Sequence, residues 1–192
     1  MNIRIMNDEL MNQIEKYSSK FNKKRKAKEE LDNEHDLLMD VFNISPEEKK
    51  KSAQYWGREL GVLWQELVKI VFANSEQIKD YTGALTVDDP EGESDEPCDL
   101  TANGYGIDTK YRIGSGDSKF TKKFRPNHNI LVERFKLKPV LLILRDDNLK
   151  SPINRAKKEG WTVYTADDSY KFIYDQTGYD LKEFLKGLKG RY

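Results

Sequence analysis

Apolar residues recur at helical spacing through the first quarter of the chain. One set lies three or four positions apart: Leu10, Ile14, Tyr17 and Phe21. A second set follows: Leu31, Leu37, Leu38, Val41 and Phe42. Such spacing places side chains on one face of a helix, where they can pack against a core. We therefore predict a helical N-terminal extension over residues 1–50.

The next segment opens with the features of a helix start. Ser45 is a capping residue, Pro46 suits the first turn, and two glutamates follow near the positive end of the helix dipole. From here we predict one helix that runs to about residue 73. Its apolar positions form a continuous stripe: Leu60, Leu63, Trp64, Leu67, Ile70 and Val71.

A hairpin is predicted in the middle of the chain. Asn103-Gly104 is a strong signal for a two-residue turn, and the flanking residues 98–101 and 105–113 have strand character. Residues 118–138 are expected to form a helix broken near Pro126. The remaining predicted elements are a buried strand over 140–144, a helix over 151–159 that ends at Gly160, a strand over 161–165, and a helical region over 169–188 interrupted near Gly178.

This order of elements predicts an α/β (α+β) fold. A strand-helix-strand unit after a hairpin implies a mixed central β-sheet with flanking helices, and helices are added at both ends. The length of 192 residues suits a single domain. We expect it to span residues 1–192, with a core over 55–165 and a C-terminal helical segment over 166–192.

Composition narrows the functional classes. Hydrophobic residues make up 37% and charged residues 34%, and the longest apolar run, 140–144, is far too short to cross a membrane. The N-terminus has no secretory apolar core, so we expect a cytoplasmic protein without membrane partners. A single cysteine, Cys98, excludes an internal disulfide, and two histidines argue against an ordinary zinc site.

Charge is segregated although the formal net charge is zero. Seven of the twelve residues over 88–99 are acidic, whereas nine residues over 110–138 are basic and only Asp117 and Glu133 are acidic. An acidic pocket followed directly by a basic stretch is typical of a protein that holds a divalent cation beside a phosphate backbone.

The hairpin carries the candidate chemistry. Asp108 and Lys110 are two positions apart in a strand and so share a face, and Asp99 is expected opposite Asp108 across the turn. Two carboxylates supply the hard oxygen ligands that Mg²⁺ prefers. A neighbouring lysine can orient a water and stabilise charge that develops on a phosphoryl group.

These residues resemble the motif of the PD-(D/E)XK nuclease superfamily, read here as Asp99 followed by Asp108-Thr109-Lys110, although Cys98 separates Pro97 from Asp99. The resemblance implies a restriction-endonuclease-like core of one helix, three strands, a helix and a strand (αβββαβ). It also implies a helix glutamate, for which Glu66 is preferred over Glu59. The implied catalytic residues are Asp99, Asp108, Lys110 and Glu66, and the implied metal ligands are Asp99, Asp108, Glu66 and Thr109. The implied cofactor is Mg²⁺, for which Mn²⁺ can substitute.

Residues after the hairpin are candidates for contact with DNA phosphates. They are Arg112, Ser115, Ser118, Lys119, Lys122, Lys123, Arg125 and His128. The glycine-rich stretch at 114–119 lacks the Gly-Lys-Ser/Thr ending of a P-loop, so no nucleotide cofactor is expected.

The resemblance implies a type II restriction endonuclease that acts on double-stranded DNA. Such enzymes usually work as homodimers that cut a short specific site and leave 5′-phosphate and 3′-hydroxyl ends. Two alternatives stay open: a structure-specific repair or recombination nuclease such as a junction resolvase, and a non-catalytic DNA-binding module on the same fold.

Overall fold

The computed structural model describes residues 3–24, 35–87, 96–114 and 118–192. Its elements in chain order are α1 (Ile3–Lys24), α2 (Leu37–Val41), α3 (Pro46–Lys50), α4 (Ala53–Asn74), β1 (Leu100–Ala102), β2 (Tyr105–Lys110), α5 (Ser118–Asn129), the π-helix η1 (Ile130–Arg134), β3 (Lys138–Ile143), α6 (Lys150–Lys158), β4 (Thr162–Thr165), α7 (Asp167–Thr177) and α8 (Leu181–Lys186). The predicted helical residue Leu31 and most of the acidic stretch, residues 88–95, lie outside the described residues.

The strands form one mixed sheet in the order β1-β2-β3-β4. β1 is antiparallel to β2, whereas β2, β3 and β4 run parallel to one another. Asn103 and Gly104 both have positive φ, 49° and 75°, as the favoured two-residue hairpin turn requires. The predicted mixed sheet with flanking helices is thus confirmed, although β2 ends at Lys110 and not at residue 113.

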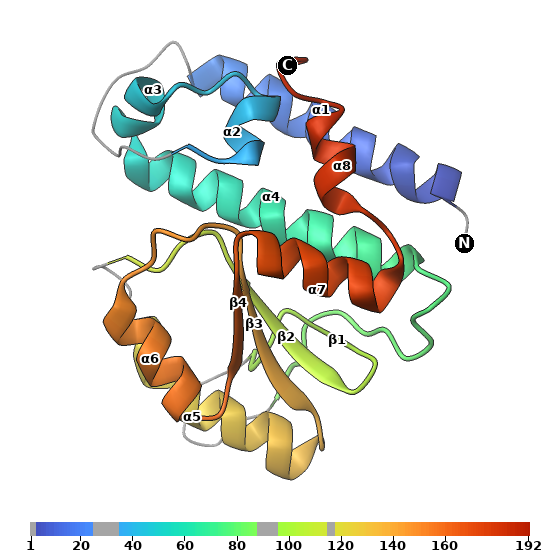
Figure 1. The fold of residues 1–192 in the computed structure, drawn as a ribbon, viewed down its shortest axis with the longest axis vertical. Helices are drawn as coiled ribbons and strands as arrows, with labels where there is room; N and C mark the ends of the chain where they lie inside the picture. The colour runs from blue at the N-terminus through green and yellow to red at the C-terminus, as the bar shows by residue number, and fades with distance from the viewer. Residues whose placement is uncertain (1–2, 25–34, 88–95, 115–117) are drawn as a thin grey trace.

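One face of the sheet is covered by α4 and α7, and α1 packs on the outer side of α4 (Figure 1). The four apolar positions predicted to line α1 are buried: Leu10, Ile14, Tyr17 and Phe21. Burying side chains of this size stabilises the fold by about 1.5–3 kcal/mol each. α1 therefore belongs to the same hydrophobic core as the sheet, and it extends that core outward by a second layer of helices.

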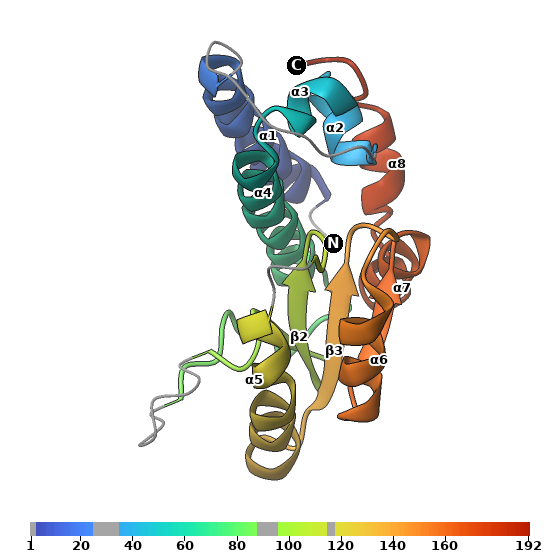
Figure 2. The same cartoon turned by 90° about the vertical axis from the view of Figure 1, so that its left-hand side faces the viewer.

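The opposite face of the sheet is covered by α5, η1 and α6, with β2 and β3 pointing toward the end of the molecule that carries α1, α2 and α3 (Figure 2). A second hydrophobic core fills this side, and Trp161 anchors it by donating from Nε1 to the Phe124 carbonyl at 2.8 Å. Leu131 packs closely on Gly106: a Cβ at that position would lie 2.7 Å from Leu131 Cδ2, so the leucine side chain would have to shift. Among the described residues, no helix is long and apolar enough to cross a membrane.

The single helix predicted from residue 45 to about 73 is in fact two helices. Ser45 caps α3 as predicted, with its Oγ accepting from Glu48 N at 3.0 Å, but the helix ends at Lys50 and α4 begins after Ser52. The break accompanies the burial of Lys49, whose ammonium lies over the Tyr111 ring at 4.7 Å. This tertiary contact has no signature in the apolar pattern, which is why the sequence did not predict the break.

The connection between β2 and β3 also differs from the implied core. The helix α5 and the π-helix η1 separate these two strands, in the region where a helix was predicted. β1, β2 and β3 therefore do not follow one another directly, as the three strands of the implied core would. The helix predicted to break near Pro126 does not break there: Pro126 lies inside α5, which continues to Asn129. The change from α-helix to π-helix comes after Asn129, where η1 begins. Before β1, an isolated antiparallel bridge pairs Thr82 with Thr101.

Asp36 joins the N-terminal segment to the end of the sheet. Its Oδ1 caps α2 by accepting from the amides of Leu38 and Met39, both at 3.1 Å. Its Oδ2 accepts a hydrogen bond from the Tyr111 hydroxyl and lies 3.6 Å from Arg145 Nη1. Burial raises the pKa of Asp36, and the hydrogen bond from Tyr111 partly offsets that rise. The segment before α4 is therefore tied to the sheet by a buried polar cluster as well as by apolar packing.

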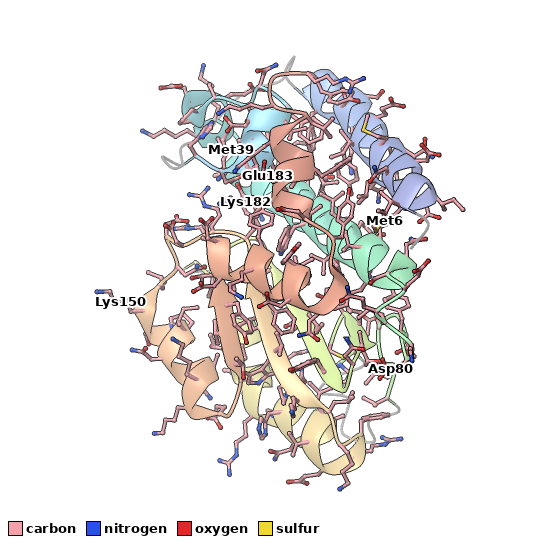
Figure 3. The ribbon with its side chains drawn as sticks, turned by 45° about the vertical axis from the view of Figure 1, so that its right-hand side comes forward. Met6, Met39, Asp80, Lys150, Lys182 and Glu183 are labelled. Atoms are coloured by element: carbon pink, nitrogen blue, oxygen red, sulfur yellow. The ribbon has the colours of Figure 1, made fainter. Side chains whose placement is uncertain are left out.

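The C-terminal helical region has the predicted interruption. Gly178 ends α7 with a left-handed φ of 69°, and α8 then turns back over α2. Figure 3 shows Met39 of α2 beside α8, which carries Lys182 and Glu183. Lys182 Nζ donates to Asp167 Oδ1 at 2.7 Å, which links α8 to the start of α7.

We predict that Gly104→Ala will destabilise the hairpin although there is open space around the new methyl group. An L-residue at φ 75° costs about 1–2 kcal/mol, so the free energy of unfolding should fall by that amount in urea denaturation. Gly83→Ala is the matched control, because Gly83 is also in open space and has no positive φ. Equal effects of the two substitutions would contradict the role of the turn.

Candidate active site

The hairpin places Asp99 directly beside Asp108. Leu100 pairs with Ile107 in the antiparallel register, and the Asp99 amide donates to the Ile107 carbonyl at 2.9 Å. Asp108 pairs with Leu141 of β3, whose side chain belongs to the core under α5 and α6. Asp108 and Lys110 therefore lie on the α5 side of the sheet, whereas Ile107 packs on the α4 side.

Both carboxylate oxygens of Asp99 accept hydrogen bonds. Oδ2 accepts from the Thr109 amide at 2.7 Å and from the Thr109 hydroxyl at 2.6 Å. Oδ1 accepts from Gln65 Nε2 of α4 at 2.5 Å. Three donors from two elements thus fix the carboxylate, and Thr109, predicted as a metal ligand, serves in this structure to hold Asp99.

Asp108 is a buried carboxyl group in the middle of the sheet. Its exposed fraction is 6%, and its Oδ1 accepts from Lys110 Nζ at 2.7 Å. Burial raises the pKa of Asp108 to about 7, the Lys110 ammonium opposes the rise, and the charge of Asp99 adds to it. A carboxyl group poised near neutral pH beside a second carboxylate is typical of a functional site, because a structural ion pair would ordinarily hold the pKa low.

Lys110 is more accessible than Asp108. Its side chain is 31% exposed, against 8% for that of Asp108. The ammonium also donates to the Thr109 carbonyl at 3.0 Å, so it is oriented by the strand on which it lies. The lysine therefore presents a fixed positive charge at the point where solvent, or a ligand, reaches the buried carboxyl group.

The structure does not bring the predicted helix glutamates to this cluster. Glu66 pairs with Lys69 at 3.5 Å on the surface of α4. The charge of Glu66 contributes to the raised pKa of both Tyr17 on α1 and Tyr81 before β1, after burial as the main cause, but it is not among the causes of the shift of Asp108. Glu59 is buried and forms ion pairs with Lys20 and Arg58.

Gln65 is the site residue that the sequence pattern did not reveal. It stands next to Glu66 in the chain, and successive residues of an α-helix point about 100° apart, so only one of the two can face the hairpin. The family resemblance favoured Glu66 on this helix, whereas in the structure Gln65 is the residue of α4 that contacts Asp99. The pattern of buried residues around position 65 was the available signal, since Trp64 and Leu67 fix the rotation of α4 about its axis.

The donor set suits a divalent cation only through its two aspartates. Within the described ranges, no group of three or more His, Cys, Asp or Glu side chains lies close enough together to hold a metal ion. Asp99 and Asp108 nevertheless place two carboxylates together. Burial, and to a smaller extent the charge of Asp99, raises the pKa of Asp108, and a bound cation would favour its ionised form. These residues fit a hard cation whose remaining ligands are water molecules or substrate oxygens.

The predicted DNA-contacting residues fall into three groups. Lys122, Lys123 and Arg125 are exposed on α5, which covers the sheet face that carries Asp108. Arg112 pairs with Asp147, whose carboxylate also binds Arg145 at 2.6 Å. Ser115 lies outside the described residues, and for Ser118 and Lys119 the structure describes the backbone of α5 alone.

His128 is separated from the end of the hairpin that carries Lys110. It lines a cavity together with Tyr105, the first residue of β2, whereas Lys110 is the last residue of that strand. Five residues of extended strand span about 16 Å. His128 is therefore not placed to act on a group bound at Lys110.

Comparison of the chain with protein-family models, with curated proteins and with solved structures gives no match. Functional inference therefore rests on the geometry of the site.

We predict that Asp108→Asn will change the pH dependence of stability in metal-free buffer. Between the unfolded pKa of about 4 and the folded pKa of about 7, the folded protein keeps a proton that the unfolded chain has released. The stability that Asp108 contributes is therefore lost as pH rises through that window. The asparagine variant has no carboxyl group at this position and does not lose stability in this way. The melting temperature of the variant relative to wild type should be higher at about pH 8 than at about pH 4.

Asp175→Asn is the control, because Asp175 forms an exposed pair with Lys171. A difference between Asp108→Asn and wild type that does not vary with pH would contradict the raised pKa.

Proposed function

We propose that this protein is a magnesium-dependent DNA endonuclease of the PD-(D/E)XK type. The observation that carries the proposal is the cluster of Asp99, Asp108 and Lys110 at one end of the hairpin, with Asp108 buried and its pKa raised to about 7. A buried charged cluster of this kind is costly to folding, and such clusters occur preferentially at functional sites.

The arrangement of elements supports the same class. If the Thr82–Thr101 bridge is counted as a first short strand, the order from α4 to β3 is helix, three strands, helix and strand. Counted in this way, the order of elements is compatible with the implied αβββαβ core, with α5 as its second helix. β2 and β3 are parallel within it, and α6 and β4 then extend the sheet.

Asp99 and Asp108 are the residues that would hold the metal. A bound Mg²⁺ would polarise a phosphate and lower the pKa of a coordinated water. Lys110 would stabilise negative charge that develops on the phosphoryl oxygens, because its ammonium lies within hydrogen-bonding distance of Asp108 and is partly exposed. Gln65 and Thr109 would keep Asp99 in one orientation throughout.

Double-stranded DNA is the proposed substrate. The exposed cations Lys122, Lys123 and Arg125 lie on the helix that follows β2 and covers the same face of the sheet as Asp108 and Lys110. Cations at such positions neutralise backbone phosphates and make binding depend on salt concentration. They carry no base-edge information by themselves, so they would position the duplex and leave specificity to other contacts.

Within this class we favour a type II restriction endonuclease that acts as a homodimer. A two-fold dimer would place two copies of the cluster on the two strands of a short palindromic site, to yield 5′-phosphate and 3′-hydroxyl ends. Purified protein, plasmid DNA and Mg²⁺ test this directly when the ends are mapped. Discrete fragments that end at one repeated sequence are expected; cleavage of branched substrates alone would instead identify a structure-specific nuclease.

We predict that Asp108→Ala and Lys110→Ala will each lower the rate of plasmid cleavage by about a thousandfold or more, because each removes a charge from the reacting centre. DNA binding in Ca²⁺ or EDTA, measured by gel shift, should stay close to that of wild type. Lys171→Ala and Asp175→Ala are matched controls from an exposed pair on α7 and should cleave normally. Undiminished cleavage by the two site variants would refute the assignment.

We also predict that Gln65→Ala will lower the cleavage rate by about 10- to 100-fold, as expected for loss of a residue that orients a metal-binding group. Glu66→Ala, one position along the helix, should change the rate little because Glu66 contacts Lys69 on the surface. Steady-state cleavage across Mg²⁺ concentrations distinguishes the two, since Gln65→Ala should also raise the Mg²⁺ concentration needed for half-maximal rate. The reverse order of effects would restore the glutamate as the helix ligand.

A further inference from the structure

A cavity of about 590 Å³ opens at the end of the sheet opposite the catalytic cluster. It is lined by the first residues of three parallel strands: Tyr105, Lys138 and Thr162. Along β2 from Tyr105, Asp108 lies about 10 Å away and Lys110 about 16 Å away. The cavity is thus separate from the proposed active site, and its volume lies within the range of small-ligand sites.

The lining has a distinctive chemistry. Lys136, Lys138 and His128 contribute its basic groups, and none of the described residues that line it is acidic, although the chain as a whole has equal numbers of acidic and basic residues. Tyr105 and Tyr164 contribute aromatic rings. Cations beside aromatic rings suit a ligand that has both a negative group and a flat ring.

The two tyrosine rings are held in place from behind. Phe172 of α7 packs against Tyr105 with ring centroids 5.4 Å apart and against Tyr164 at 4.8 Å. The Lys138 ammonium lies 5.8 Å from the centre of the Tyr105 ring, so one cation is already placed next to one aromatic surface. An aromatic ring that enters the cavity would therefore contact tyrosine side chains that are already ordered in the folded protein. Binding would then cost little further side-chain entropy.

The roof of the cavity is built from unusual backbone. The π-helix η1 carries Val132 into the lining, and Lys136 follows it with a left-handed φ of 58°. On the other side, Gly160 has a φ of 92°, and a Cβ there would overlap His128 Nε2. π-helical turns and left-handed residues other than glycine occur preferentially at functional sites, where they aim particular side chains.

We propose that this cavity binds a nucleotide, with the base against the tyrosine rings and the phosphate on Lys136 and Lys138. The two sources of that chemistry are a free mononucleotide and a nucleotide within a single DNA strand. Base stacking on aromatic side chains accepts any base, so the site would be tolerant of base identity. The proposal does not depend on nuclease activity, because it rests on a different part of the molecule.

Isothermal titration calorimetry of the full chain in EDTA tests the proposal, with dTMP, thymidine, inorganic phosphate and pentathymidylate as probes. EDTA prevents cleavage, so the result is independent of the proposed nuclease function. We expect dTMP to bind with a Kd below about 1 mM, and thymidine and phosphate alone to bind at least about tenfold more weakly. Pentathymidylate that binds more tightly than dTMP would identify a strand as the source; equal affinities would identify the free nucleotide.

Charge-reversal variants locate the binding. Lys136→Glu and Lys138→Glu should each weaken dTMP binding at least about tenfold, because each removes a charge-assisted contact and adds repulsion. Lys79→Glu, an exposed lysine outside the lining, should bind as wild type does. The Gly160 amide resonance in a ¹⁵N-correlated spectrum should shift with dTMP in wild type. No binding of dTMP or pentathymidylate at about 1 mM, or unchanged binding by both variants, would overturn the proposal.

Discussion

The middle of strand β2 is enclosed on both faces and both edges, and the rest of the structure depends on this enclosure. It pairs with β1 and β3, packs on α4 through Ile107, and meets Leu131 of η1 at Gly106. A strand without free edges or open faces has one register, because a shift of one residue would exchange its two faces. That register carries Asp108 into the core beside Asp99, and it leaves Lys110 at the boundary with solvent.

The fold thus holds a carboxyl group where ionisation is unfavourable. Burial and the neighbouring Asp99 raise the pKa of Asp108, and Lys110 only partly offsets them. Replacement of such a group with an apolar residue of similar size often stabilises a protein, so its presence indicates a requirement other than folding. In the proposed nuclease, a cation would relieve the repulsion between the two aspartates, and this relief would contribute to the free energy of metal binding.

The sequence predicted those features that depend on local chemistry. Asn103-Gly104 specifies the turn, and a turn at that position sets Asp99 opposite Asp108. Features set by tertiary packing could not be predicted in this way. Whether Gln65 or Glu66 faces the hairpin depends on the rotation of α4 against the sheet, and the break before α4 accompanies the burial of Lys49. The winding of η1 is equally nonlocal, since the packing of Leu131 on Gly106 has no sequence motif.

The contact of Asp36 with Tyr111 and Arg145 bears on where this protein can be cut without loss of its fold. By sequence, the region before α4 resembles an appendage to a compact catalytic unit. In space, Asp36 supplies a carboxylate to the Arg145 side chain, which is 2% exposed and lies just beyond the end of β3. A shortened chain that began at α4 would leave this guanidinium with less neutralising charge inside the protein, close to the end of the strand that carries Lys110. The segment that carries Asp36 and α2 therefore contributes to the charge balance at the end of the sheet as well as to the apolar core.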